Sequence, residues 1–413
     1  MSIDIVILSF ATLIGLYMAA NIGANDLANA MGTSVGSGAI TLKQAVLISI
    51  IANTLGAVLA GGYVTNTISK GMIDPGLLAG DPNKLMLGMF AALISAGLWV
   101  NLATYFALPV STTHAIVGSV VGFGMISVGA GAVNWDKIIT IAISWIISPV
   151  TGACIAGGMY YFAEKKILSS KDPYKAAENY APFLVFLVFV ILILSVIFKA
   201  LKNLDLDFGV FMITLITIPL AAVAAAFGRS WVRWQQGRPR LQAYSPVEGL
   251  FAQLQVLAAC YIAFAHGAND VANAVGPLAA IFSVVKTKTV ALQVGVPFWM
   301  LFVGGLAVGG GLLVFGTRVM ETIGKNITEI TPIRGFCAQF GAATTILVCS
   351  RLGLPVSTTH VLVGSVVGVG LMRGMGALDL RILKNIGFSW IVTLPFTMLL
   401  AMLLYKLLTY FLL

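Results

Sequence analysis

The decapeptide GANDLANAMG at Gly23–Gly32 recurs as GANDVANAVG at Gly267–Gly276, 244 residues further along the chain. Each copy carries one aspartate into a long apolar stretch. A longer segment, LPVSTTHAIVGSVVG at Leu108–Gly122, recurs as LPVSTTHVLVGSVVG at Leu354–Gly368, with 13 of 15 residues identical and an offset of 246 residues. The two nearly equal offsets indicate that the chain contains two copies of one structural unit.

Composition places the chain in a lipid bilayer. Of its 413 residues, 59% are hydrophobic and 9% are charged, whereas a soluble domain carries roughly 25% charged residues. A helix of about 20 apolar residues is long enough to cross the ~30 Å hydrocarbon core. Apolar runs occur near Ile3–Ile22, Ala45–Val64, Leu85–Leu108, Ala115–Val133, Ile138–Phe162, Phe183–Phe198, Phe208–Phe227, Leu250–Ala265, Val290–Phe315, Gly335–Leu352, Val361–Leu371 and Ile382–Leu413. We therefore predict an all-α integral membrane protein, a polytopic helical bundle of about 12 membrane segments.

The basic residues predict the orientation of this bundle. Cytoplasmic loops are enriched in Lys and Arg, so we expect cytoplasmic loops on both flanks of the central apolar pair, at Lys165, Lys166, Lys171, Lys175, Arg229, Arg233, Arg238 and Arg240. The turn between that pair then faces outside, with Lys199, Lys202, Asp205 and Asp207. These loops explain the net charge of +9, and nucleic-acid binding is not expected.

The number of runs predicts inverted repeats. We expect an N-terminal repeat over residues 1–165, a central segment with two transmembrane helices over 166–247, and a C-terminal repeat over 248–413. Each repeat holds five apolar runs, and an odd number reverses the polarity of the second repeat. Both termini are then outside a multi-pass protein of the cell (cytoplasmic) membrane. The runs that flank each PVSTTH segment either cross the membrane or fold as re-entrant hairpins, and broken helices are expected in both repeats.

Asp26 and Asp270 are the acidic residues inside the repeated decapeptides. An ionised carboxylate at the centre of a membrane helix costs ~2.5–3.5 kcal/mol even on the mildest insertion scale. Both are flanked by asparagines, namely Asn25, Asn29, Asn269 and Asn273. On a helix, residues three or four apart share a face, and we expect Gly23 to break the helix and free backbone carbonyls. Such hard oxygen ligands suit Na⁺, although a protonated aspartate that bridges two helices would give the same pattern.

The second repeated segment predicts two helix starts. Pro109 and Pro355 suit a first helical turn. Three consecutive hydroxyl residues follow each proline, Ser111, Thr112 and Thr113 in the first copy and Ser357, Thr358 and Thr359 in the second. Helix N-termini rich in hydroxyls bind anions, although ordinary capping also uses such residues. Inverted symmetry would direct both helix starts at one tetrahedral oxyanion near the bilayer midplane.

A bound anion and two bare carboxylates would repel one another, so we expect cations or protons to enter with the anion. His114 and His360 end the two hydroxyl runs and are candidates for a proton relay or for a hydroxyl-capping network. His266 precedes the second decapeptide, but Ile22 holds the equivalent position in the first. We therefore do not expect His266 to belong to a machinery shared by both repeats.

Together these motifs resemble the inorganic phosphate transporter (PiT) family, whose signatures are a repeated GANDVANA-type motif and a repeated P-[VI]-S-T-T-H segment. The resemblance covers the whole chain, and Leu27 replaces the usual Val of the first motif. It implies a secondary active transporter, not an enzyme, that imports inorganic phosphate by symport with a cation, without a cofactor. The implied phosphate ligands are Asn25, Ser111, Thr112, Thr113, Asn269, Ser357, Thr358 and Thr359. The implied Na⁺ ligands are Asp26, Asn29, Asp270 and Asn273, and no other metal is expected.

Several alternatives stay open at this point. Coupling to H⁺ in place of Na⁺, transport of metal phosphate, and sulfate as the anion are all compatible with the resemblance, and arsenate shares the geometry of phosphate. An intramembrane hydrolase lacks a Gly-x-Gly-Asp pattern, and a passive anion channel would gain nothing from two buried carboxylates. Buried amides such as Asn53, Asn101, Gln253 and Gln339 are expected to bridge helices. The small residues Gly304, Gly305, Gly309, Gly310 and Gly311 suit packing against another helix or against the second subunit of a homodimer.

Overall fold

A computed structural model describes residues 3–203, 209–235, 245–290, 295–326, 330–374 and 379–412. Over these residues the chain is helical, and its one β-type pairing is an isolated bridge between Ile73 and Val133. Nine helices in this part of the chain are long and apolar enough to cross a membrane, and shorter apolar helices lie at Thr112–Ser127, Phe298–Val314 and Thr358–Leu371. The predicted all-α, polytopic fold is confirmed.

The first repeat is a series of helices interrupted by wider turns. Its elements are α1 (Ile3–Ile22), η1 (Gly23–Leu27), α2 (Ala28–Gly36), α3 (Leu42–Ile48), η2 (Ser49–Asn53), α4 (Thr54–Ala60), α5 (Gly62–Asn66), η3 (Thr67–Gly71), η4 (Pro75–Leu78), α6 (Pro82–Tyr105), α7 (Thr112–Ser127), η5 (Ala130–Ala132), α8 (Trp135–Ala163) and η6 (Glu164–Leu168). The elements η1, η2, η3 and η6 are single π-helical turns that continue their α-helices without a break. The helix expected over the apolar run Ala115–Val133 is α7, which ends earlier than the run, at Ser127.

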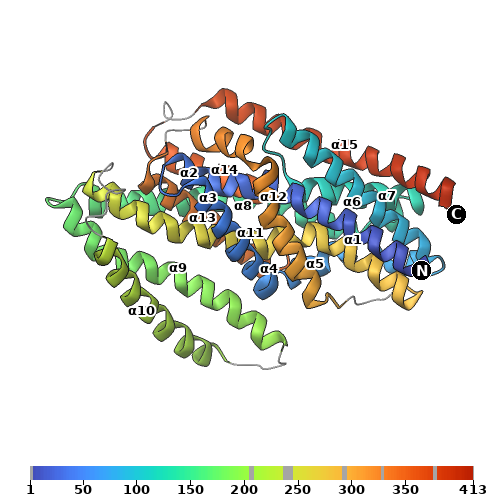
Figure 1. Cartoon of the computed structure of the whole chain (residues 1–413), viewed down its shortest axis with the longest axis horizontal. Helices are drawn as coiled ribbons and strands as arrows, with labels where there is room; N and C mark the ends of the chain where they lie inside the picture. The colour runs from blue at the N-terminus through green and yellow to red at the C-terminus, as the bar shows by residue number, and fades with distance from the viewer. Residues whose placement is uncertain are drawn as a thin grey trace.

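The second repeat follows the same order with fewer interruptions. The central pair α9 (Pro173–Asn203) and α10 (Val210–Gln235) comes first, followed by α11 (Pro246–Thr287), α12 (Phe298–Asn326), α13 (Pro332–Arg351), α14 (Thr358–Leu371) and α15 (Leu380–Leu412). Figure 1 shows α9 and α10 as a hairpin beside the main bundle, and both chain ends at one end of that bundle. The shared position of the termini agrees with five membrane elements per repeat. Asp205, Asp207, Arg238 and Arg240, which entered the orientation argument, lie outside the described residues.

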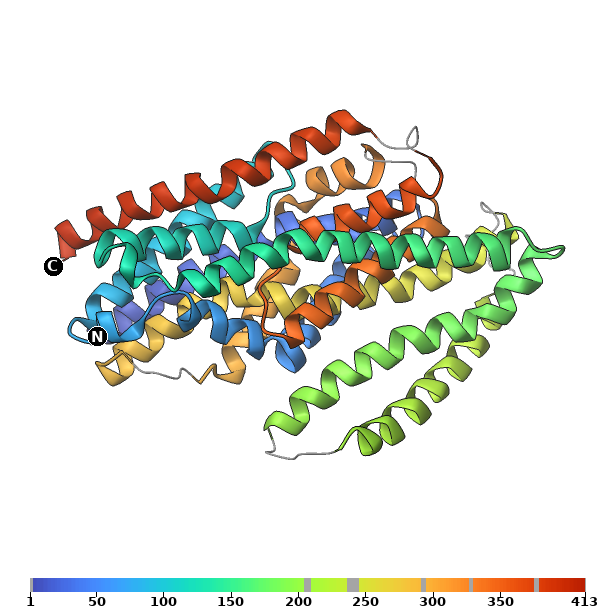
Figure 2. The ribbon, with the colours of Figure 1, turned by 180° about the vertical axis from the view of Figure 1, so that it is seen from behind.

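The segments around each PVSTTH form hairpins that meet tip to tip. In the first hairpin, the residues before α6 lie beside those after α7: the Asp74 amide donates to the Ala132 carbonyl at 2.9 Å. Thr113 Oγ1 of one hairpin tip donates to the Val356 carbonyl of the other at 3.0 Å. In Figure 2, α7 and α14 run from this meeting point toward opposite ends of the bundle. The two hairpins therefore enter the bundle from opposite ends and meet inside it, which is the arrangement expected of re-entrant hairpins.

Each hairpin packs against a long helix of the other repeat. Helices α6 and α7 pack against α15, while α13 and α14 pack against α8. Side-chain hydrogen bonds fix one of these interfaces: Ser95 Oγ donates to the Thr397 carbonyl at 2.9 Å, and Trp99 Nε1 donates to Thr393 Oγ1 at 3.0 Å. The repeats are thus interleaved, and neither could keep this packing without the other.

Glycines allow the helices around the two GAND motifs to touch backbone to backbone. A Cβ atom on Gly23 would lie 1.7 Å from the Val308 carbonyl oxygen, and one on Gly267 would lie 1.9 Å from the Asn53 carbonyl oxygen. On α12, a Cβ atom on Gly311 would lie 1.9 Å from the Ala20 carbonyl oxygen. Gly304, Gly305 and Gly309 also pack against residues of the same chain. The Gly-rich face of α12 therefore serves the fold of one chain, and the predicted homodimer draws no support from it.

Gly311 and its neighbour Gly310 offer a matched test of this packing, because a Cβ atom on Gly310 would meet nothing within 4 Å. Gly311→Ala forces α12 away from α1 and should destabilise the protein by about 1–3 kcal/mol, as overpacked cores do. Gly310→Ala should be neutral or slightly stabilising, since alanine is the better helix former. Thermal unfolding of the two variants in detergent checks this, and equal melting temperatures would contradict the proposed contact.

Candidate functional site

Asp26 lies in the π-helical turn η1, in the middle of a continuous helix from Ile3 to Gly36. We expected Gly23 to break this helix, but the helix only widens to a single π-helical turn and then continues as α2. Gly23 has no side chain, and this allows the backbone of α12 to lie directly against the π-helical turn. In the second repeat the same motif lies within the regular helix α11. The two copies of one sequence therefore adopt different backbone conformations.

Both PVSTTH segments begin helices, as predicted. Ser111 is the N-cap of α7 and its side chain accepts from the His114 amide at 3.1 Å, and Ser357 caps α14 by accepting from the His360 amide at 3.2 Å. Pro109 and Pro355 are not in the first turn, because each lies two residues before the capping serine. They instead shape the irregular connection that leads into the helix.

The hydroxyls of both helix starts converge on Asp26. Thr112 Oγ1 donates to Asp26 Oδ2, and Thr359 Oγ1 of the opposite hairpin donates to Asp26 Oδ1 at 2.7 Å. Asn29 Nδ2 donates to Thr359 Oγ1 at 3.0 Å. From the second repeat, Asn273 Nδ2 lies 3.2 Å from the hydroxyl oxygens of both Thr112 and Thr113. The structure thus joins residues that are more than 300 positions apart in the sequence.

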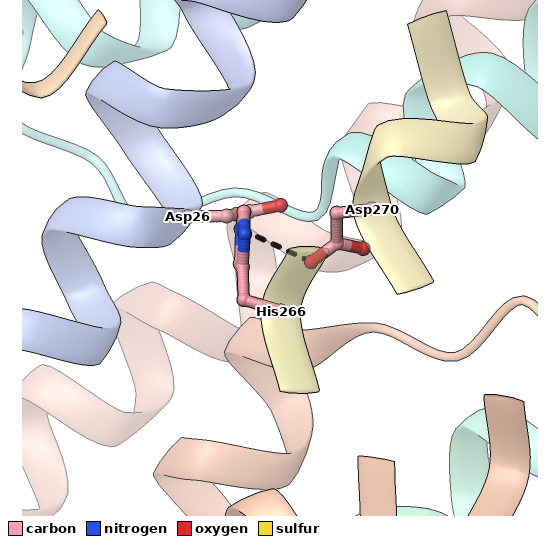
Figure 3. Close-up of side chains that lie close together, drawn as sticks. All are labelled: Asp26, His266 and Asp270. Atoms are coloured by element: carbon pink, nitrogen blue, oxygen red, sulfur yellow. Dashed lines mark ion pairs between the residues drawn. The ribbon is translucent and has the colours of Figure 1, made fainter. Parts of the chain in front are cut away.

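Asp270 completes this cluster together with a histidine. His266 Nε2 lies 3.1 Å from Asp270 Oδ2, one turn along the same helix, and His266 Nδ1 lies 2.8 Å from Asn53 Oδ1. Ligand atoms of Asp26, His266 and Asp270 all lie within 4.8 Å of one another, and all three residues are buried. Figure 3 shows the Asp26 side chain from one helix beside His266 and Asp270 from the other.

His266 was excluded by the comparison of the repeats because Ile22 occupies the matching position, and this criterion was wrong for a site that is not symmetric. The spacing of His266 and Asp270 could have indicated this contact, since residues four apart on a helix share a face. Asn53 was expected to bridge helices, and it does so by donating to the Gly305 carbonyl at 3.0 Å. Its oxygen also faces His266, so this amide belongs to the site as well.

Asn25 and Asn269 lie outside the cluster. Asn25 Nδ2 donates to Thr104 Oγ1 and to the Leu108 carbonyl, both at 3.0 Å, while its Oδ1 accepts from the Val110 amide at 3.1 Å. Asn269 Nδ2 repeats this arrangement with Ser350 Oγ at 3.0 Å and the Leu354 carbonyl at 3.3 Å. Both amides hold the connection of a hairpin tip. Asn269 Oδ1 accepts from no donor among the described residues, and the phosphate contact expected of both asparagines stays a prediction.

Asp270 Oδ2 and two amide oxygens in the cluster lack a hydrogen-bond donor among the described residues. Asn29 Oδ1 and Asn273 Oδ1, one from each repeat, accept from no donor among the described residues. A buried acceptor without a partner costs about 1–3 kcal/mol. Together with the carboxylates of Asp26 and Asp270, they form an oxygen-rich set of the kind that binds hard cations.

His114 and His360 form a separate edge-to-face pair next to the helix starts. Their ring centroids are 4.5 Å apart, and each ring also packs on a tryptophan, His114 on Trp145 at 3.9 Å and His360 on Trp390 at 3.5 Å. Trp145 Nε1 donates to the Pro355 carbonyl at 3.0 Å. The histidines are thus part of the packing that holds the two hairpins together.

The other buried amides mainly join helices. Asn101 Nδ2 donates to Asn21 Oδ1 at 2.9 Å, and Gln339 Nε2 donates to Ser34 Oγ at 2.7 Å. These contacts confirm the helix-bridging role predicted for Asn101 and Gln339.

A polytopic bundle with two opposed re-entrant hairpins and a buried polar site where they meet defines a membrane transporter. The sequence profile of the phosphate transporter family matches residues 22–401, and the chain belongs to this family. A candidate phosphate permease of Pyrococcus horikoshii is 43% identical over 396 residues, which cover 96% of each chain. The chloroplastic inorganic phosphate transporter 2-1 of Arabidopsis thaliana is 41% identical, covering 94% of this chain and 70% of the relative.

A solved structure gives the same result. The fold superposes on a sodium-dependent phosphate transporter with a TM-score of 0.91 and 39% identity, covering 98% of this chain and 100% of the other. The predicted family and its fold are confirmed, and the protein is a multi-pass membrane transporter and not an enzyme.

His266 provides a test of the asymmetric site. His266→Leu removes the ring that lies 3.1 Å from Asp270 Oδ2 and the hydrogen bond to Asn53 Oδ1, and leaving a buried hydrogen-bonding group without its partner costs on the order of 1–3 kcal/mol. Phosphate uptake into proteoliposomes should therefore fall by about tenfold or more. Ile22→Leu, at the matching position of the first repeat, should leave uptake unchanged. Normal uptake by the folded His266→Leu protein would remove this histidine from the working site.

Proposed function

We propose that this protein imports inorganic phosphate across the cytoplasmic membrane by symport with Na⁺, with alternating access around the site where the two hairpin tips meet. One observation carries the proposal: two helix starts that approach from opposite sides place their threonines around two buried carboxylates. An anion-binding feature and a cation-binding feature thus share one enclosed place. Arsenate, which has the geometry of phosphate, would enter by the same route.

The anion is drawn by the helix starts. Each helix N-terminus carries roughly +0.5 of an elementary charge and free backbone N–H groups. Helices α7 and α14 begin at the meeting point and run away from it (Figure 2), so their positive ends act on the same place. The hydroxyls of Thr112, Thr113, Thr358 and Thr359 lie at the same helix starts. In this conformation Thr112 and Thr359 donate to Asp26 and Thr113 donates to the Val356 carbonyl, and we propose that they turn to the tetrahedral anion when cations take their place at the carboxylates.

The cation is drawn by Asp26, Asp270 and the two donor-free oxygens of Asn29 and Asn273. A phosphate in contact with bare carboxylates would be repelled, and a bound cation removes that repulsion. Oxygen ligands of this kind favour Na⁺. The sodium dependence named for the similar solved structure supports the same choice.

Proton-coupled symport is the second candidate. It is favoured by the contact between His266 and Asp270, which brings an ionisable base to one of the two carboxylates. In that case His266, and not the pair of His114 and His360, would be the proton-accepting group nearest to the acids.

Alternating access is supported by the differences between the repeats. The first GAND motif has a π-helical turn and the second does not. Trp145 Nε1 donates to the Pro355 carbonyl, whereas the equivalent Trp390 Nε1 is buried without a partner among the described residues. We propose that the repeats exchange these two conformations when the site opens to the other side. The basic ends of α8 and α10 would face the cytoplasm, and both termini the outside.

Linkage between the two ions tests the coupling. Sodium near Asp26 and Asp270 should raise phosphate affinity, and phosphate should raise sodium affinity by the same factor. We expect at least a tenfold effect in isothermal titrations with phosphate in choline buffer and then in Na⁺ buffer. Asp270→Asn should abolish the difference between the buffers. Equal affinity in both buffers for the native protein, with uptake driven by a pH gradient, would establish protons as the coupling ion.

The anion site has its own test. Replacing Thr358 and Thr359 together by Val keeps the shape but removes two hydroxyls, at on the order of 1.5–3 kcal/mol for each hydrogen bond to a charged group. Phosphate affinity should fall by about tenfold or more. Thr345→Val is the control, because the Thr345 hydroxyl bonds the Gly341 carbonyl of its own helix. If the double variant binds phosphate as tightly as the control, the anion binds elsewhere.

A further inference from the structure

A crevice lies between the α9–α10 hairpin and α11. In Figures 1 and 2 this hairpin lies along one side of the molecule, with α9 packed on α10 and on α11. The crevice has a volume of about 790 Å³ between these three helices, within the range of roughly 300–1,000 Å³ that is typical of small-molecule sites. Its walls are mainly apolar and include Phe189 of α9, Val223 and Phe227 of α10, and Leu257 of α11.

One polar side chain interrupts the apolar wall. Gln253 of α11 lines the crevice, is 5% exposed, and its Oε1 has no hydrogen-bond donor among the described residues. Gln255, two residues along, shows the usual alternative: its Oε1 accepts from Ser37 Oγ at 2.7 Å and its Nε2 donates to the Thr33 carbonyl at 3.2 Å. Buried polar groups normally have partners. The oxygen of Gln253 therefore indicates a ligand that carries a hydrogen-bond donor.

One basic residue adjoins the lining of the crevice, and others lie farther toward the ends of the same helices. One end of the crevice lies toward the start of α9, the end of α10 and the start of α11. The lining residues at this end are Val185, Gly228 and Gln253. Arg229 directly follows Gly228 and is exposed. The π-helical turn η6, the loop after it and the first turns of α9 carry the bases Lys165, Lys166, Lys171 and Lys175 and the acids Glu164, Asp172 and Glu178. An excess of positive charge thus lies beside the polar end of an apolar crevice.

We propose that this crevice binds one anionic phospholipid with a hydroxyl-bearing headgroup, of the phosphatidylglycerol type. An acyl chain would lie along the apolar wall between α10 and α11. The phosphate would face Arg229 and the lysines, and a headgroup hydroxyl would donate to Gln253 Oε1. Basic pockets between membrane helices bind anionic headgroups in this way. The lipid would fix the hairpin to α11, the helix that carries Asp270.

Lipid binding to the purified full-length protein in detergent tests the proposal. Native mass spectrometry with phosphatidylglycerol and with phosphatidylcholine should show one tightly bound phosphatidylglycerol and at least tenfold weaker phosphatidylcholine binding. Ala224→Trp fills the crevice from α10 and should abolish the bound lipid. Ala222→Trp, at an exposed position of the same helix that does not line the crevice, should have no effect.

Two further variants test the contacts to the lipid headgroup without filling the crevice. Arg229→Gln and Gln253→Leu should each weaken phosphatidylglycerol binding by about fivefold or more without changing phosphatidylcholine binding, and Lys406→Gln on α15 serves as the charge control. Elution as a folded, monodisperse protein is required of each variant. Equal binding of the two lipids, or unchanged binding by folded Ala224→Trp, would overturn the proposal. A change of oligomeric state in Ala224→Trp without loss of lipid would show that a second copy of the chain occupies the crevice, which would also overturn it.

Discussion

Asp26 and Asp270 are buried next to each other in the middle of the bundle, and the rest of the structure depends on how their charges are held. Two like charges 4 Å apart repel by about 4 kcal/mol at an effective dielectric constant of 20. The positive ends of α7 and α14 and the threonine hydroxyls act against this repulsion, and in the proposed function a bound cation would do the same. A site that is favourable only when its ions are present together is the physical basis of coupled transport.

The interleaved repeats explain how such a site can be exposed to one side at a time. Each hairpin belongs to one repeat but packs against the long helix of the other, so a movement of one hairpin changes the support of its counterpart. The tips share direct contacts, including the one from Thr113 to Val356. Small differences, such as the π-helical turn at Asp26 and the partner of Trp145, show that the two halves are not equivalent in this conformation. If the two repeats exchanged these conformations, the site would open to the opposite side of the membrane, as the proposed alternating access requires.

Close backbone contacts set the limits of this movement. Gly23, Gly267 and Gly311 bring helices so near to one another that a single methyl group would collide with a carbonyl oxygen. These contacts surround the GAND motifs and fix the positions of Asp26 and Asp270, whereas a crevice lies between the α9–α10 hairpin and α11. The molecule thus combines a tightly packed core around the two aspartates with a peripheral hairpin in which α9 packs on the bundle and a crevice remains between α10 and α11.

The sequence by itself determined what can be read along one helix. Apolar length predicted the membrane spans, repetition predicted the paired halves, and the PVSTTH hydroxyls predicted two helix starts, because these signals are local. Tertiary structure decided which of these residues meet. It brought His266 between Asn53 and Asp270, placed Asn25 and Asn269 at the hairpin connections, and made the two hairpin tips meet inside the bundle. Contacts between residues hundreds of positions apart depend on how whole helices pack, and a comparison of two repeats cannot reveal a site whose halves differ.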